Sequence, residues 1–139
     1  MKISDPKPKP LENDEYEAIK IGLNGYNEKF TGSLLREDVS SVLKDEAGNT
    51  LGAIIGEINW GWLYIKALWI DESIRNEGWG QKLLYGFEKY SLSKGISKIR
   101  LETTTFQALG FYEKLGYTVF AELEDQPPGE TSFFLKKSI

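Results

Sequence analysis

The residues best suited to chemistry lie in one stretch, 68–81, where an apolar run is followed by Arg75-x-x-Gly78-x-Gly80. Glycines allow main-chain N–H groups to approach a ligand closely, because they carry no Cβ. If a helix begins there, its first turn adds unpaired N–H donors and a partial positive charge, which suit a phosphate. The guanidinium of Arg75 can also hold phosphate oxygens. We therefore predict a pyrophosphate-binding loop.

A simpler interpretation is that these glycines only turn the chain, since so short a pattern arises by chance in roughly one chain in seven of this length. The expected strand before the loop and helix after it favour binding. The loop lacks the extra glycine and the Lys-Ser/Thr of a P-loop, which disfavours nucleoside triphosphate hydrolysis.

The composition limits the chemistry further. The 139 residues include neither cysteine nor histidine, which excludes thiol nucleophiles, zinc–thiolate sites and histidine-dependent triads. Proton transfer must then use Glu, Asp, Tyr, Lys, a terminus or water. No metal site is expected.

Hydrophobic spacing predicts a scaffold of mixed α/β type that positions this loop. Apolar residues at three- and four-residue steps predict a helix over 16–30, although Gly22 and Gly25 should weaken it or break it in two. A second helix around 83–90 should end at Gly95, a usual helix-terminating residue. The other elements expected are strands at 39–44, 50–58, 62–70, 96–103, 117–123 and 132–136 and a short helix at 106–115.

The strand at 62–70 is almost entirely apolar, which is typical of a strand buried on both faces. Residues 1–12 alternate lysine and proline, which predicts an extended leader. We expect one domain over 13–139, in keeping with the usual size of domains.

Charge and hydropathy exclude some classes of function. The net charge of −4 disfavours nucleic-acid binding, which normally requires a basic face. No apolar run approaches the ~20 residues of a membrane span, and the N-terminus has no signal-peptide pattern. A cytoplasmic protein without membrane or nucleic-acid partners is the default expectation.

Two blocks of sequence together resemble a known family. Leu68-x-Ile70 followed by Arg75-x-x-Gly78-x-Gly80 resembles the signature motif of the GCN5-related N-acetyltransferases (GNAT), and 108–117 (ALGFYEKLGY) is similar to that family's C-terminal motif. The resemblance implies a single-domain fold whose mixed, mostly antiparallel sheet is flanked by helices, with a V-shaped splay between two central parallel strands. It also implies acetyl-CoA as the cofactor.

The chain departs from the family pattern at two places. The family often has proline where Glu72 stands and asparagine where Thr105 stands. The second departure leaves the cofactor contacts near Thr105 less certain.

By this resemblance, the backbone of Trp69 and Ile70 binds the pantetheine arm, and the Ile70 N–H stabilises the oxyanion of a tetrahedral intermediate. Residues 75–81 cradle the pyrophosphate, mainly through main-chain N–H groups. The full set of cofactor-binding residues implied is Leu68, Trp69, Ile70, Arg75, Asn76, Glu77, Gly78, Trp79, Gly80, Gln81, Thr105, Ala108, Phe111 and Tyr112.

Three residues are catalytic candidates. Tyr112 aligns with the family's usual general acid, and a phenol with a pKa near 10 holds its proton at pH 7; the alternative is a half-buried core tyrosine. The general base is Glu102, at the carboxyl end of an inner strand, or Glu57. Either carboxylate could instead be a solvated charge, with water chains taking the proton.

Aromatic residues suggest where the acceptor binds. Trp60, Trp62, Tyr64 and Trp69 crowd one predicted hairpin and strand, and core packing would explain most of them. Trp62 and Tyr64 are nevertheless candidate substrate-binding residues, and Tyr26 and Asn27 could reach the same pocket.

The function implied is transfer of acetyl from acetyl-CoA to a primary amine, by direct attack, with a small molecule as the expected acceptor. Acetylation of a protein N-terminus or lysine is one alternative, and a non-catalytic acyl-CoA-binding or regulatory module is another. By analogy with small members of the family, edge strands near the C-terminus could form a homodimer.

Overall fold

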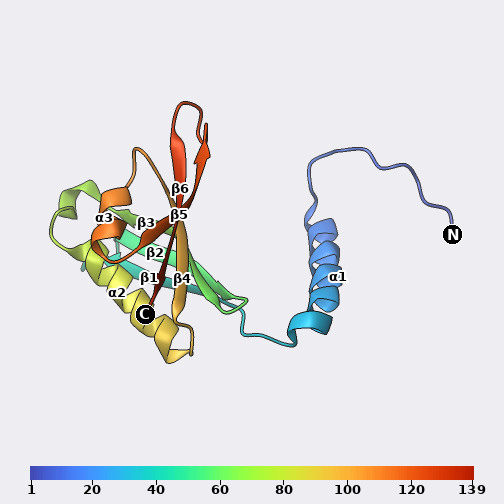
Figure 1. Ribbon diagram of the computed structural model, residues 1–139, viewed down its shortest axis with the longest axis horizontal. Helices are drawn as coiled ribbons and strands as arrows, with labels where there is room; N and C mark the ends of the chain where they lie inside the picture. The colour runs from blue at the N-terminus through green and yellow to red at the C-terminus, as the bar shows by residue number, and fades with distance from the viewer. The chain divides into compact units, whose positions relative to one another are not determined.

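The computed structural model covers residues 1–139 and consists of two compact units, 1–34 and 35–139. In the first unit, residues without helix or strand lead into helix α1 (Asn13–Thr31) (Figure 1). The start of α1 is stabilised by Glu15, whose carboxylate accepts a hydrogen bond from the Glu12 N–H at 3.3 Å. Lys9 pairs with the same carboxylate.

Helix α1 is continuous across Gly22 and Gly25, so the expected break is wrong. A glycine in a helix costs only ~1 kcal/mol relative to alanine. Two such positions weaken a helix of 19 residues without forcing it to bend or stop.

The second unit is a mixed α/β structure in the predicted order. Its elements are β1 (Glu37–Lys44), β2 (Thr50–Asn59), β3 (Trp62–Ile70), the 3-10 turn η1 (Glu72–Ile74), α2 (Trp79–Ser93), β4 (Lys98–Thr104), α3 (Leu109–Lys114), β5 (Thr118–Glu124) and β6 (Thr131–Ser138). The six strands form one sheet in the order β1-β2-β3-β4-β6-β5. Only the central pair, β3 and β4, is parallel.

The central strands diverge after a short contact, which confirms the V-shaped splay. Their parallel pairing begins at Leu63↔Ile99 and ends at Ile65↔Leu101, although β3 continues to Ile70 and β4 to Thr104. On its other side, β3 carries a β-bulge, because the pairing with β2 passes from Ile65 to Ala67 and omits Lys66. A bulge bends a strand and changes the direction of its side chains.

Gly56 of β2 lies beside this bulge and leaves room for α2. A Cβ built on Gly56 would stand 2.5 Å from the Tyr64 carbonyl oxygen and 3.0 Å from the ring of Phe87. Any larger residue would collide with the main chain of β3 as well as with Phe87 of α2, at the point where the strands begin to separate.

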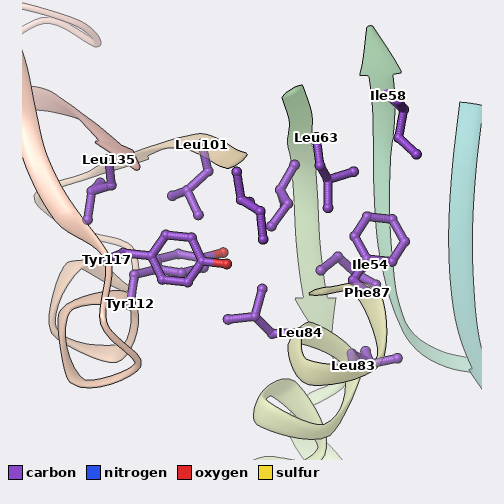
Figure 2. Close-up of a cluster of buried hydrophobic side chains, with 12 residues drawn as sticks. Ile54, Ile58, Leu63, Leu83, Leu84, Phe87, Leu101, Tyr112, Tyr117 and Leu135 are labelled. Atoms are coloured by element: carbon purple, nitrogen blue, oxygen red, sulfur yellow. The ribbon is translucent and has the colours of Figure 1, made fainter. Parts of the chain in front are cut away.

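The core lies on the face of the sheet that α2 and α3 cover (Figure 2). Branched aliphatic side chains from four strands meet those of the helices there, and burial of such side chains supplies most of the stability. The buried members are Ile54, Ile58, Leu63, Ile65, Leu83, Leu84, Phe87, Ile99, Leu101, Tyr112, Tyr117 and Leu135.

Two local predictions are wrong. Strand β3 is not buried on both faces: only Leu63 and Ile65 are buried in it, and the Trp69 side chain is 48% exposed. One reason is that α2 and α3 cover only one face of the sheet, so Trp62 and Tyr64 on the other face are only partly buried. The other is the splay, which removes the neighbouring strand from the second half of β3. The short helix begins at Leu109 rather than at 106, because Gln107 accepts a hydrogen bond from the Thr104 N–H and holds a turn.

Helix α2 ends as expected, with Gly95 in a left-handed conformation just after it. None of the helices has the length and hydropathy of a membrane-spanning segment.

Candidate active site

A cleft of about 840 Å³ opens where β3 and β4 diverge. Its walls are the second half of β3, the end of β4, the loop leading into α2, and α3. Most predicted cofactor-binding residues meet at this cleft. They are Leu68, Trp69, Ile70, Arg75, Asn76, Gly78, Trp79, Gly80, Gln81, Ala108, Phe111 and Tyr112.

The loop before α2 has the backbone of an anion site. Asn76 and Gly78 have φ angles of 64° and 86°, in the left-handed region that favours glycine. The main-chain N–H groups of residues 76–81 donate no hydrogen bond within the chain. They open a helix of 15 residues, whose N-terminus carries a partial positive charge. A diphosphate fits this loop, because it would satisfy these free donors.

The side chain of Arg75 is held at the edge of this loop. Its Nε donates a hydrogen bond to the Ile70 carbonyl oxygen at 2.9 Å. The remaining guanidinium N–H groups are therefore presented beside the free main-chain donors. The loop is braced by Asp71, which accepts a hydrogen bond from the Ser73 N–H at 3.0 Å.

Tyr112 lies on the α2 side of the cleft and is 6% exposed. Its ring packs between those of Phe111 and Tyr117, at centroid distances of 5.1 and 5.8 Å. Its hydroxyl has no hydrogen-bond partner within the chain, and burial raises the pKa of Tyr112 to about 12. The phenol is therefore a proton donor that stays neutral and is free to bind a ligand.

Glu102 is the carboxylate that lines the cleft. It accepts a hydrogen bond from the Tyr64 hydroxyl at 3.2 Å. Burial, and then the nearby Glu102 charge, raise the pKa of Tyr64. The Arg100 guanidinium stacks on the Tyr64 ring at 4.0 Å. Tyr64, which is not part of the cleft lining, thus holds Glu102 in place.

Glu57, the other candidate base, does not line the cleft. Its carboxylate is 16% exposed and forms ion pairs with Arg36 at 3.2 Å and Lys66 at 3.1 Å. This carboxylate is thus already occupied by two cations. Of the two candidates, only Glu102 faces the space where a reaction could occur.

Three other predicted residues lie outside the cleft lining. Glu77 and Thr105 are outside the cleft lining, and the Thr105 hydroxyl binds the Glu130 carboxylate. Trp62 is outside the cleft too, with the Lys98 ammonium over its ring. Tyr26 and Asn27 belong to α1, in the first unit, and their role stays a prediction.

The sequence-based interpretation missed Lys66, Phe106 and Gln107, which all line the cleft. Lys66 is the single charged residue within the apolar strand 62–70. That interruption of the apolar pattern could have identified it as a candidate site residue. Phe106 was assigned to a helix, whereas it lies in the turn before α3 and is largely exposed.

Comparisons with known proteins agree with this geometry. The sequence profile of the Acetyltransferase (GNAT) family matches residues 5–117. The chain is 37% identical over 95 residues to a blasticidin-S acetyltransferase of Streptomyces morookaense, an alignment that spans 68% of this chain and 70% of that protein.

Solved structures share the fold. An acetyltransferase from Bacillus cereus ATCC 14579 superposes with a TM-score of 0.85 at 34% identity, over 96% of this chain and 98% of that one. A Bacillus anthracis str. Ames protein solved in complex with acetyl coenzyme A gives 0.65 at 21% identity, over 82% and 68% of the two chains. The chain therefore belongs to the Acetyltransferase (GNAT) family and is an acyltransferase that uses acetyl-CoA.

Proposed function

We propose that this protein transfers the acetyl group of acetyl-CoA to a primary amine of a small molecule. The observation that carries the proposal is the pairing of two groups in one cleft. The Tyr112 hydroxyl is a buried proton donor without a partner, and the Glu102 carboxylate is a proton acceptor. A binding module would need neither.

When bound, acetyl-CoA supplies an activated acetyl thioester. The free N–H groups of residues 76–81 and the Arg75 guanidinium bind its diphosphate. Beyond Ile65, β3 has no partner on its β4 side, so the strand edge at Trp69 and Ile70 offers main-chain donors to the pantetheine arm and the acyl oxygen.

The proton transfers use the two side chains. An alkylammonium with a pKa near 10.4 must lose a proton before its nitrogen can attack, and Glu102 accepts that proton directly or through one water. As the new amide bond forms and the carbon–sulfur bond breaks, the nitrogen would lose its second proton to water and Tyr112 would give its proton to the departing sulfur. Solvent then returns a proton to Tyr112 and takes up the proton held by Glu102.

A small acceptor is supported by the relative named for acetylation of blasticidin S. Acetylation of a protein N-terminus or lysine would instead require an extended groove for a peptide.

Thiol release measured across a panel of amines tests the proposal. We expect calorimetry to detect acetyl-CoA binding, and one or more small amines, blasticidin S among those tried, to release coenzyme A. Tight acetyl-CoA binding without thiol release on any amine or peptide would contradict the enzyme and favour a non-catalytic acyl-CoA-binding module.

We also propose that the protein acts in the cytoplasm, as a homodimer. Strand β5 is one edge of the sheet, and it exposes Phe120 and Leu123, which supports pairing near the C-terminus. Leu123→Lys should then yield a monomer in sedimentation experiments. The matched change Val42→Lys, on the opposite edge strand β1, should leave the dimer intact; a monomeric wild type contradicts the dimer.

A further inference from the structure

We infer that the acceptor is an amine that also carries an anionic oxygen group a few bonds from its nitrogen, with Lys66 binding the anion and Glu102 facing the amine. This inference rests on the proposed function and names the class of substrate. It follows from the charged residues on the face of the sheet that α2 does not cover.

The contacts of the cleft residues assign them to two faces. Tyr112 and Leu101 belong to the core under α2 and α3. Tyr64 and Glu102 alternate with core residues along their strands, and their side chains touch each other. Side chains alternate between faces along a strand, so these two lie on the opposite face.

Lys66 lies on that opposite face too. As the bulged residue of β3 it has no partner on β2, and its Nζ lies 3.1 Å from Glu57, the residue paired with Tyr64 across the strands. Because Lys66 and Glu102 both line the cleft, the cleft passes through the sheet at the splay. The coenzyme loop is at the start of α2, so we expect the acceptor to enter through the opening on the other face of the sheet, where Lys66 and Glu102 lie.

The charges around this opening do not favour a polycation. The cationic side chains are Arg36, Lys66 and Arg100, and the anionic ones are Glu57, Glu102 and Asp38, which is paired with Glu57 across the strands, so no net negative charge is left to attract one. Arg36 and Lys66 share the single carboxylate of Glu57, so each has capacity for another anion. A second ammonium on the acceptor would meet these cations at close range, where like charges repel.

The strand positions set the spacing of the two groups. Lys66 and Glu102 each follow directly after the last parallel pair, Ile65↔Leu101. Paired strands are about 5 Å apart and widen beyond that point. An ammonium at Glu102 and an anion at Lys66 are therefore separated by a few bonds, as in short amino acids or amines bearing a phosphate.

Matched amines test this class. Thiol release is measured with 4-aminobutyrate and O-phosphoethanolamine, against butylamine and 1,4-diaminobutane, at equal concentrations of the unprotonated amine. We expect kcat/KM to be at least tenfold higher for an anionic amine than for the neutral and dicationic ones. The two anionic probes distinguish a carboxylate from a phosphate.

The variant Lys66→Met should reduce that preference to less than twofold, and Lys66→Arg should retain it. The control is Lys136→Met, which removes a charge from the same face next to Arg100 but outside the cleft, and it should keep the preference. Acetyl-CoA affinity by calorimetry reports whether each variant is folded.

A preference for butylamine or 1,4-diaminobutane overturns the inference, and so does an anionic preference that survives Lys66→Met. Both outcomes leave the acetyltransferase intact. Calorimetric titration of 4-aminobutyrate and O-phosphoethanolamine into the protein saturated with coenzyme A separates the two proposals. Binding that is lost in Lys66→Met supports the inference even without turnover, whereas no binding of either probe overturns it.

Discussion

Tyr112 and Tyr117 lie next to each other in the core (Figure 2), and their rings pack edge to face. The hydrogen bonding of their hydroxyls differs. The Tyr117 hydroxyl donates a hydrogen bond of 2.8 Å to Glu88, whose carboxylate also pairs with Lys137 at 2.9 Å. The Tyr112 hydroxyl has no partner in the chain and faces the cleft.

This difference separates a structural tyrosine from the proposed general acid. A hydroxyl that is cut off from solvent normally finds a partner, because leaving it unpaired costs free energy. Tyr117 follows that rule. The Tyr112 hydroxyl is not cut off from solvent: it opens on the cleft that the free N–H groups of the α2 loop also line. The comparison predicts that removal of the two hydroxyls has opposite consequences.

The largest effect is expected for Tyr112→Phe. We expect kcat to fall by about 100-fold, the scale of general acid catalysis. Acetyl-CoA affinity should be unchanged, and so should the free energy of unfolding, since no hydrogen bond within the protein is lost. Steady-state kinetics, calorimetry and urea denaturation measure the three quantities. A kcat within threefold of wild type would assign Tyr112 to the core instead.

Tyr117→Phe should lower the stability and leave the activity largely intact. Removing the phenol takes one donor from the buried carboxylate of Glu88, which still has Lys137, so the free energy of unfolding should fall by about 1–2 kcal/mol. The value of kcat should stay within about threefold. Urea denaturation measures the free energy of unfolding, and steady-state kinetics measure kcat. A loss of activity comparable to that of Tyr112→Phe would remove the distinction between the two tyrosines.

A smaller effect is expected at high pH. The pKa of Tyr112 is raised to about 12 in the folded protein, against about 10 in the unfolded chain. The folded state therefore holds this proton more tightly, so wild type keeps its full stability below pH 10 and loses it as the pH rises towards 12.

Tyr112→Phe has no such proton. At pH 10.5 wild type should have lost about 0.8 kcal/mol more than this variant, relative to pH 8. Unfolding of both proteins at the two pH values measures the difference. Tyr117, whose pKa is also raised, by burial and by Glu88, is present in both proteins and cancels. Equal losses would mean that the Tyr112 phenol ionises normally and is open to water.

The loop proposed to bind the coenzyme could be located from the sequence. Arg75, Gly78 and Gly80 are close together in the chain, and their conformation is fixed by local features: a glycine at the helix N-terminus and a strand before it. Tyr112 was found through the similarity of 108–117 to a family motif. Its lack of a hydrogen-bond partner was invisible until the fold brought Tyr117 and Glu88 together.

The acceptor half could not be predicted in the same way. Nothing in the sequence distinguishes Glu57 from Glu102 as a base, because that depends on the Arg36 and Lys66 ion pairs, which join residues of separate strands. The exposure of Trp69 was missed for a related reason: an apolar strand normally has a neighbour on each side, and here β4 has turned away.

The sequence alone determined the class of fold, the phosphate loop and the absence of cysteine and histidine from the chemistry, because these depend on residue types and on neighbours in the chain. The tertiary structure alone decided where β3 and β4 separate, which carboxylate faces the cleft and which tyrosine hydroxyl is left free. Those depend on contacts between segments far apart in sequence, and no local spacing specifies them.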